Sequence, residues 1–212
     1  IMMTSGISRA DRILAVYPMM FAAGAVAIER LGRLGRTAIV GMLVIGTLPP
    51  LPLVLPILPP PRLIEYSKAL AVTPQLEIAK RGAMPQWLGD KRGWPEVVSA
   101  TVAAYGSLTP EDQRQTVVFG ADYGIAGALE LDGRWGAVMS THDAFWTWGP
   151  RPGAIVLAVG HDQAYWDALY ADVRRSGTVT CSGCLVDGTA IWIVKDPRPG
   201  VAARWPALRR FE

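Results

Sequence analysis

The sequence predicts two N-terminal transmembrane helices followed by a soluble α/β domain with a mostly parallel sheet flanked by helices. Three observations support this fold class. Residues 1–61 contain two long stretches without charge. Residues 62–212 alternate between short β-branched runs and helical patterns, as in domains whose parallel strands are joined by crossover helices. Only 18% of the 212 residues are charged, against about a quarter in ordinary globular domains, and this deficit lies almost entirely before residue 62.

The first apolar stretch, about residues 11–30, predicts a short membrane helix. Its centre, Ile13–Ile28, holds 16 residues without a charge. A membrane span needs about 20 apolar residues, so we expect Arg12 and Arg30 to extend toward the lipid headgroups. The small residues at 22–25 are typical of helices that pack closely against other membrane helices. A secretory signal and a buried helix of a globular domain are the alternatives.

The second apolar stretch, about residues 37–58, predicts a kinked membrane helix with a proline-rich exit. Thr37–Pro61 holds 25 residues without a charge. Proline lacks a backbone donor and disfavours helix at the preceding residue, so we expect helix to about Leu48 and somewhat beyond, followed by an extended segment. A structural proline-rich linker is the alternative. The prolines are Pro49, Pro50, Pro52, Pro56, Pro59, Pro60 and Pro61.

The charge distribution predicts the orientation of the chain. Arg30, Arg33 and Arg36 lie between the two apolar stretches, and the positive-inside rule places such a loop in the cytoplasm. The protein is then integral to the plasma membrane, with residues 1–61 as the membrane region and residues 62–212 as an extracytoplasmic domain. The lipid bilayer is therefore a predicted partner. Nucleic acid is not, because the net charge of +3 is small and dispersed.

Residues 62–212 predict a series of strands and helices. The clearest strands are Thr116–Gly120 and Ala154–Gly160, and Ala137–Ser140 is a shorter one. Thr178–Leu185 and Ala190–Lys195 predict an antiparallel pair at one edge of the sheet, joined at Asp187-Gly188. The predicted helices are Pro95–Tyr105, Tyr123–Leu131, Gln163–Arg174 and Val201–Arg209, with a turn or short capped helix at Thr109–Glu111.

The glycine-rich run Gly120–Gly127 lies between a predicted strand and a predicted helix, where phosphate-binding loops occur. Its spacing matches neither a Walker loop nor a complete dinucleotide fingerprint. Tight packing of the strand against the helix is the favoured explanation for these glycines. The alternative is that Asp122 or Tyr123 contacts a ligand.

The run Ser140–Pro150 is the most unusual stretch of the sequence. It follows a predicted strand, at the edge where open α/β sheets bind ligands. His142 and Asp143 could carry out acid–base chemistry. Trp146 and Trp148 could stack on a sugar ring or lie at a membrane interface. The favoured alternative is a buried aromatic loop with a hydrogen-bonded histidine.

The two cysteines, Cys181 and Cys184, are three residues apart. Zinc would need two further ligands, and the sequence offers only His142 and His161 for that role, so no metal site is predicted. In an oxidising compartment the pair predicts a local structural disulfide. A redox module is a weaker alternative, because such pairs open a helix in thioredoxin-like proteins, whereas this pair lies beside a predicted strand.

Seven short motifs follow one another along nearly the whole chain. They are Ala15–Ala25, Leu53–Pro60, Met84-Pro85-Gln86, Gly93-Trp94-Pro95-Glu96, Tyr123–Ala128, Ser140–Pro150, and the Cys181–Cys184 pair before Trp205-Pro206. Each motif is weak alone. Together and in this order, they resemble the C-terminal part of bacterial family 39 glycosyltransferases, which are dolichyl-phosphate-mannose protein mannosyltransferase-like enzymes of GT-C architecture.

The resemblance implies transfer of a sugar from a polyprenyl-phosphate donor to an acceptor at the outer face of the membrane. The catalytic carboxylate of that architecture lies in an extracytoplasmic loop near the N-terminus, which would precede Ile1, so we assign no catalytic residue here. The resemblance further implies upstream transmembrane helices as partners, no cofactor in this chain, and room for a divalent metal in the full-length enzyme. The alternative function is a non-catalytic, membrane-anchored extracytoplasmic binding or scaffold module.

Overall fold

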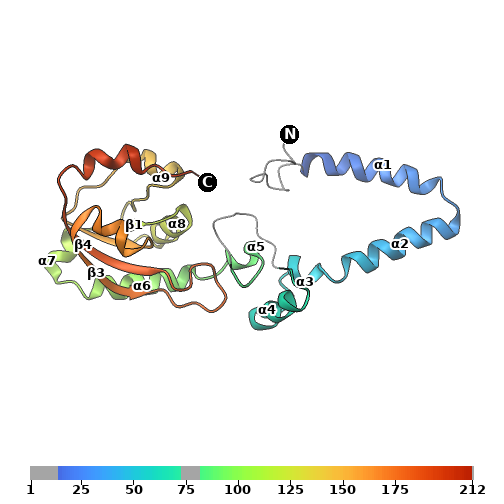
Figure 1. Cartoon of the computed structure of the whole chain (residues 1–212), viewed down its shortest axis with the longest axis horizontal. Coiled ribbons are helices and arrows are strands. Elements are labelled where there is room, and N and C mark those ends of the chain that lie inside the picture. The colour runs from blue at the N-terminus through green and yellow to red at the C-terminus, as the bar shows by residue number, and fades with distance from the viewer. Residues whose placement is uncertain (1–13, 73–81, 212) are drawn as a thin grey trace. The chain divides into compact units, whose positions relative to one another are not determined.

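The computed structural model describes residues 14–72 and 82–211 of the 212-residue chain. The chain divides into two compact units, residues 1–90 and residues 91–212. We call the first the helical unit and the second the α/β unit (Figure 1). The predicted boundary after residue 61 lies inside the helical unit.

The described part of the helical unit contains short helices, of which the first two form a hairpin. α1 and α2 contact each other on either side of a short turn (Figure 1). α2 begins after Gly32, whose backbone is extended, and ends shortly before a pair of prolines. The helices are α1 (Tyr17–Glu29), α2 (Arg33–Thr47), α3 (Leu51–Val54), α4 (Pro60–Ala69) and α5 (Gln86–Gly89).

The prediction of two N-terminal transmembrane helices is wrong for the described residues, none of whose helices is long and apolar enough to cross a membrane. α1 has 13 residues and α2 has 15. At 1.5 Å per residue they are about 20 and 22 Å long, against about 30 Å for the hydrocarbon core of a bilayer. α1 ends where Glu29 and Arg30 follow the apolar run, and α2 ends before Pro49. Residues 11–13 of the first predicted span lie outside the described residues.

The predicted extended exit is also wrong, because two helices begin among its prolines. α3 and α4 each carry proline in their first two positions, where a helix has no partner for the missing N–H. The Tyr66 hydroxyl donates a hydrogen bond to the Pro49 carbonyl at 2.7 Å, and the Trp87 indole N–H donates to the Leu53 carbonyl at 3.0 Å. These bonds surround a small apolar cluster made of Leu53, Leu63, Met84 and Leu88.

The α/β unit begins with a helix of 13 residues and continues as shorter helices and strands (Figure 1). β1 matches the predicted strand Thr116–Gly120, and β2 lies inside the predicted strand Ala154–Gly160, so both predictions are confirmed. The elements are α6 (Trp94–Gly106), α7 (Pro110–Arg114), β1 (Thr116–Gly120), α8 (Tyr123–Asp132), α9 (Asp143–Thr147), β2 (Ile155–Val159), α10 (Gln163–Asp167), β3 (Tyr170–Thr178), β4 (Ala190–Pro197) and the 3₁₀ helix η2 (Ala202–Leu208).

The four strands form a mixed sheet in the order β1-β2-β4-β3. β1 and β2 are parallel, with Thr116 opposite Ile155 and Gly120 opposite Val159. β4 is antiparallel to both of its neighbours. The prediction of a mostly parallel sheet is therefore wrong, since one of the three strand pairings is parallel.

The connection between β3 and β4 explains this topology. Residues 179–189 join these two strands as an antiparallel pair, and β4 lies between β3 and β2, so β2 and β3 run in the same direction. The predicted helix Gln163–Arg174 is wrong beyond α10, and the predicted strand Thr178–Leu185 is wrong after its first residue. β3 carries exposed charges, as edge strands commonly do, and their spacing resembles the polar face of a helix.

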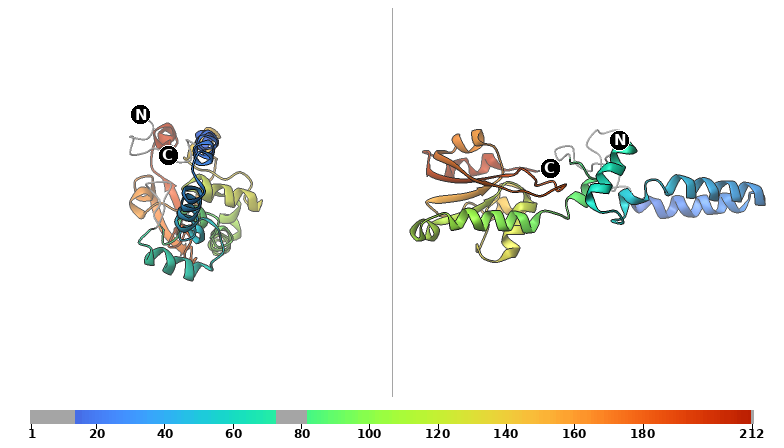
Figure 2. Two further views of the ribbon diagram at one scale, coloured as in Figure 1. Left: turned by 90° about the vertical axis from the view of Figure 1, so that its right-hand side faces the viewer. Right: turned by 90° about the horizontal axis from the view of Figure 1, so that it is seen from below.

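The two faces of the sheet are covered by different helices (Figure 2). On one face α6 and α8 pack against Val118, Leu157 and Ile193. On the other face α10 and η2 pack against side chains that point the opposite way, such as Phe119 and Val156. β2 is buried along its whole length, which accounts for its uninterrupted apolar sequence.

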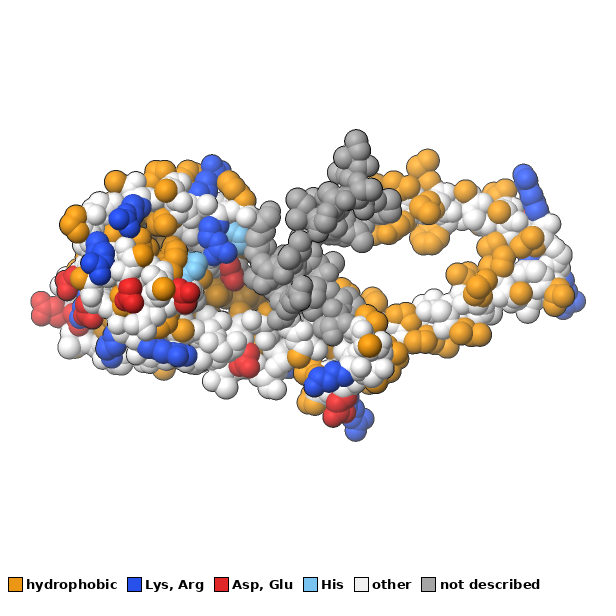
Figure 3. Space-filling model, viewed as in Figure 1, with side chains coloured by type: hydrophobic (Ala, Val, Ile, Leu, Met, Phe, Trp, Pro, Cys, Tyr) orange, Lys and Arg blue, Asp and Glu red, His pale blue; other side chains and the backbone are white. Residues whose placement is uncertain are grey.

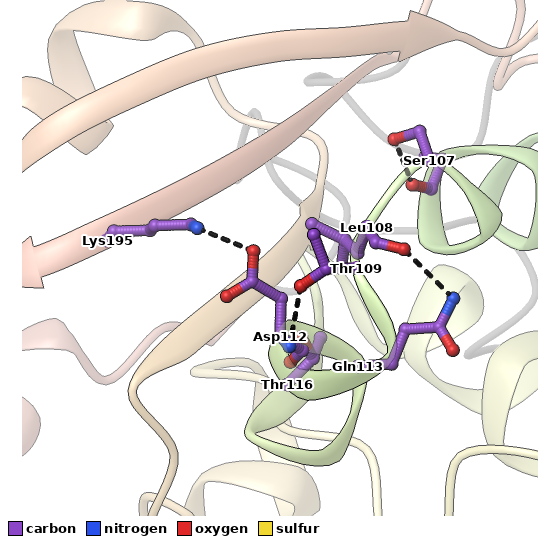
Figure 4. Close-up of polar contacts among 8 residues, drawn as sticks. Ser107, Leu108, Thr109, Asp112, Gln113, Thr116 and Lys195 are labelled. Atoms are coloured by element: carbon purple, nitrogen blue, oxygen red, sulfur yellow. Dashed lines mark hydrogen bonds and ion pairs between the residues drawn. The ribbon is translucent and has the colours of Figure 1, made fainter.

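α7 is tied both to the turn before it and to the sheet (Figure 4). Thr109 caps the helix by accepting the Asp112 N–H at 3.2 Å. The Gln113 side-chain amide donates to the Leu108 carbonyl at 3.3 Å. Lys195 of β4 pairs with the Asp112 carboxylate at 2.9 Å. These contacts fix the start of β1, which follows α7 directly.

Gly120 at the end of β1 provides a test of the packing between β1 and α8. A Cβ on Gly120 would lie 2.5 Å from the backbone nitrogen of Ala126, so Gly120→Ala forces the helix away from the strand. We expect it to lower the free energy of unfolding by about 1–3 kcal/mol. Gly127→Ala is the matched control, because nothing lies within 4 Å of its Cβ and alanine favours helix by about 0.5–1 kcal/mol. Urea unfolding of the two variants checks this, and equal stabilities would contradict the close packing.

Candidate functional site

The carboxyl ends of three parallel segments meet at one edge of the sheet. β1 and β2 end side by side, and Met139 extends the pattern by pairing with Phe119 in a parallel bridge. The Gly120 N–H donates to the Met139 carbonyl at 2.9 Å, and the Met139 N–H donates to the Val118 carbonyl at 2.8 Å. The loops that follow these segments therefore leave the sheet at the same edge, where open α/β sheets place ligands.

Asp122 and Tyr123 follow β1 and begin α8. The Asp122 carboxylate caps this helix by accepting the Ile125 N–H at 2.8 Å. The backbone N–H of Tyr123 donates to Nδ1 of His142 at 3.1 Å, and the two rings have centroids 5.1 Å apart. Because a backbone N–H can only donate, Nδ1 carries no proton in this arrangement. His142 is thus held as a neutral, fully buried ring beside the half-exposed Tyr123.

The C-terminal segment adds a cation to the same place. The Asp143 N–H donates to the Arg210 carbonyl at 3.0 Å, and the Arg210 N–H donates to the Thr141 carbonyl at 2.9 Å. The two segments are therefore parallel neighbours at residues 142 and 210. The Arg210 guanidinium reaches the Ala121 carbonyl at 3.5 Å.

His161 follows β2 and completes the site. Its ring stacks on Tyr165 with centroids 3.8 Å apart. Burial, and then the positive charge of Arg210, lower the pKa of His161 from 6.5 to about 4, while the carboxylates of Asp162 and Asp122 act in the opposite direction. Its Nε2 is buried and has no hydrogen-bond partner among the described residues.

We call Asp122, Tyr123, His142, His161 and Arg210 the strand-end site. It contains a carboxylate, a phenol, two neutral imidazoles and a guanidinium. Such a set can donate to and accept from the hydroxyl groups of a polar ligand, and Arg210 can bind an anionic group. The part of the chain that the structure describes holds no group of three or more potential metal ligands.

We call the segment Ser140–Pro150 the aromatic loop, and its two tryptophans lie in different environments. The Trp146 indole N–H donates to the Trp205 carbonyl at 3.0 Å, and the Trp205 N–H donates to the Trp146 carbonyl at 3.0 Å. The guanidinium of Arg209 lies 4.3 Å from the Trp146 ring centroid. Trp148 is 50% exposed and contacts Phe145 edge to face. Trp148 is thus accessible to a ligand, whereas the Trp146 ring is occupied by protein contacts.

The structure brings together three of the sequence-predicted site residues, Asp122, Tyr123 and His142. Asp143 lies beside them with a carboxylate oxygen 3.8 Å from Nε2 of His142, which is longer than a hydrogen bond. His161 was not predicted as part of this site, although its place directly after β2 is a usable signal. Nothing in the local sequence points to Arg210, because its partner segment lies far away along the chain.

Cys181 and Cys184 lie in the loop between β3 and β4, which leaves the sheet at the same edge as the ends of β1 and β2. They form a disulfide with Cα atoms 5.7 Å apart. Both are buried, and the Asp187 carboxylate accepts the Cys181 N–H at 2.8 Å. A Cβ on Gly93 would lie 2.9 Å from the Cys184 sulfur, so this loop packs directly against the start of α6.

No protein-family model matches the chain, and neither a curated protein nor a solved structure matches it.

The lowered pKa of His161 predicts a pH-dependent stability. Between pH 6.5 and about 4 the unfolded chain binds a proton at His161 that the folded chain excludes, so stability falls as the pH falls through this window. His161→Asn removes the titrating group, and asparagine tolerates the positive φ of 55° found here. We expect the free energy of unfolding to fall by roughly 1–3 kcal/mol more in wild type than in the variant between pH 7 and pH 4.5. Urea unfolding at both pH values measures this, and parallel losses would contradict it.

The two tryptophans of the aromatic loop predict losses of stability of different size. Trp146→Ala removes the contacts to Trp205 and Arg209, so we expect a loss of about 2–4 kcal/mol of unfolding free energy. Trp148→Ala changes an exposed ring and should cost less than about 1 kcal/mol. Thermal unfolding distinguishes them, and a larger loss for Trp148→Ala would refute the assignment.

Proposed function

We propose that this chain acts in glycosyl transfer, as the C-terminal part of a GT-C glycosyltransferase that uses a polyprenyl-phosphate sugar donor. In this proposal the strand-end site binds the sugar-bearing part of a substrate, and the bond-forming carboxylate belongs to another part of the enzyme. The acceptor is located at the outer face of the membrane.

One observation carries the proposal. Two of the motifs that resemble family 39 glycosyltransferases, Tyr123–Ala128 and Ser140–Pro150, are separate in sequence and adjacent in the fold. They meet through the hydrogen bond from the Tyr123 N–H to Nδ1 of His142. A resemblance that arose from packing alone would not be expected to concentrate at the sheet edge where ligands bind.

The chemistry of the site supports a carbohydrate ligand. Sugars present many hydroxyl groups, which are recognised by carboxylate, phenol, imidazole and guanidinium groups at fixed positions. The half-exposed Trp148 ring lies in the same loop as His142 and offers an apolar face for a pyranose ring.

The helical unit supports contact with an apolar phase. Hydrophobic side chains are exposed along α1 and α2 (Figure 3). Met19 is 73% exposed, Phe21 is 74% and Ile45 is 73%. Exposed apolar surfaces of this extent are typical of contact with lipid or with other apolar helices. A polyprenyl-phosphate donor is itself found in lipid, so such contact would bring the enzyme to its substrate.

A non-catalytic binding or scaffold module is the second candidate. It is favoured by the strand-end site, whose groups are oriented by the fold and suit recognition of a polar ligand. The coding sequence on the 5′ side of the Ile1 codon separates the two candidates. An open frame that encodes several apolar helices and an acidic loop favours the enzyme, and an immediate start codon favours the module.

Asp122→Asn and Tyr123→Phe test the role of the strand-end site in transfer. Asparagine retains the helix cap, and phenylalanine retains the ring, so both variants should fold normally. Each change removes a charge or a hydroxyl that would contact the sugar. We expect the rate of sugar transfer by the complete enzyme to fall by about three- to tenfold in each variant, the equivalent of one hydrogen bond.

Asp172→Asn on β3 is the matched control, because Asp172 is an exposed carboxylate on the edge strand. It should leave the transfer rate unchanged. If both site variants unfold at the wild-type midpoint and transfer sugar at the wild-type rate, the strand-end site has no part in the reaction.

A further inference from the structure

A groove lies on the face of the sheet that α10 and η2 cover, next to the strand-end site. Its volume is about 370 Å³, within the range of small-molecule pockets. Thr141 and Tyr165 line it and connect it to the strand-end site, since Tyr165 also stacks on His161. The apolar lining includes Phe119, Val156, Trp166, Tyr170, Trp205 and Leu208. We call this space the apolar groove.

The charged side chains of the apolar groove are all of one sign. Among the described residues that line it, Arg151 and Arg198 are the charged ones, and no carboxylate is present. Arg198 donates through Nε to the Asp167 carbonyl at 2.9 Å, which positions the guanidinium without neutralising its charge. Both arginines are exposed, so they lie on the solvent side of the groove.

This combination does not suit a neutral sugar. The polar side chains of the lining besides the arginines are mainly hydroxyls, those of Thr141, Tyr165 and Tyr170. An apolar floor with cations at its edge instead complements a molecule with a hydrocarbon part and an anionic part. The exposed apolar side chains of α1 and α2 are compatible with such a ligand, because surfaces of this kind contact lipid or other apolar helices.

We propose that the apolar groove binds the hydrocarbon chain of a phosphate-bearing lipid, with the phosphate against Arg151 or Arg198. The inference does not rest on sugar transfer, because a binding module at a lipid surface could use the same groove. A straight acyl chain and a branched prenyl chain share this chemistry, and the competition experiment below distinguishes them.

The experiment is photo-crosslinking of the 212-residue chain with dodecyl phosphate that carries a diazirine on its chain. Mass spectrometry then locates the labelled peptides. We expect labelling at residues 150–153 or 198–208, and competition by unlabelled dodecyl phosphate. Farnesyl phosphate that competes at lower concentration identifies the prenyl chain as preferred, and the reverse order identifies the acyl chain.

Two pairs of variants distinguish specific binding of the probe in the groove from its non-specific partition onto apolar surfaces of the protein. Arg151→Gln or Arg198→Gln, whichever removes the arginine that binds the phosphate, should lower labelling of the groove on the order of tenfold, whereas Arg174→Gln, on the exposed edge strand β3, should not. Ala202→Phe narrows the groove from η2 and should also lower labelling. Ala203→Phe is its control, because Ala203 is an exposed neighbour on the same helix and is not part of the lining.

Three outcomes would overturn the proposal. The first is labelling confined to residues 14–72, and the second is labelling that neither Arg151→Gln nor Arg198→Gln lowers. The third is competition by dodecanol as strong as that by dodecyl phosphate, which means apolar partition alone. None of these bears on the transfer rates of Asp122→Asn and Tyr123→Phe, so failure here is distinguishable from failure of the proposed function.

Discussion

The parallel pairing of β1 with β2 is the constraint on which the strand-end site depends. The two strands pair in register to their last residues, so the loops after them leave the sheet at one level. The Ala121 N–H continues the ladder by donating to the Val159 carbonyl at 2.9 Å. Gly160 has φ +99°, and a Cβ there would lie 2.4 Å from the Ala121 Cβ. The loops therefore approach each other more closely than side chains would allow, which places His161 within electrostatic reach of Asp122.

The C-terminal residues 205–211 cover this edge of the sheet, because Arg210 pairs with the distant segment around His142. Arg210 bonds to the chain on both sides of His142, and Arg209 lies between the rings of Trp146 and Phe211, at 4.3 and 4.1 Å from their centroids. The reciprocal indole bonds between Trp146 and Trp205 anchor the same segment through η2. The contacts of the aromatic loop are thus chiefly structural, and they hold His142 in place against Tyr123.

Local sequence patterns were sufficient to predict β1, β2 and the glycine-rich turn after β1. Each of these is an apolar run, or the turn-forming residues that end one. They failed at β3, whose charges at residues 172, 174 and 175 suit an exposed edge strand and a helix surface equally well. They also failed at α1 and α2, since apolar content without a charge does not fix helix length. Three of the five residues of the strand-end site, Asp122, Tyr123 and His142, were predicted from their places after strands. Arg210 was not, because its position depends on pairing with a segment that is distant along the chain.

The protonation states at the strand-end site argue for binding rather than for bond formation. An effective general base has a pKa near the working pH, and the pKa of His161 near 4 makes its neutral ring a weak base at pH 7. His142 uses Nδ1 to accept the Tyr123 N–H, and Asp122 uses one oxygen to cap α8. These groups are oriented by the fold, so they can select and align a polar ligand at little cost in side-chain entropy. Such an arrangement suits recognition of a polar ligand.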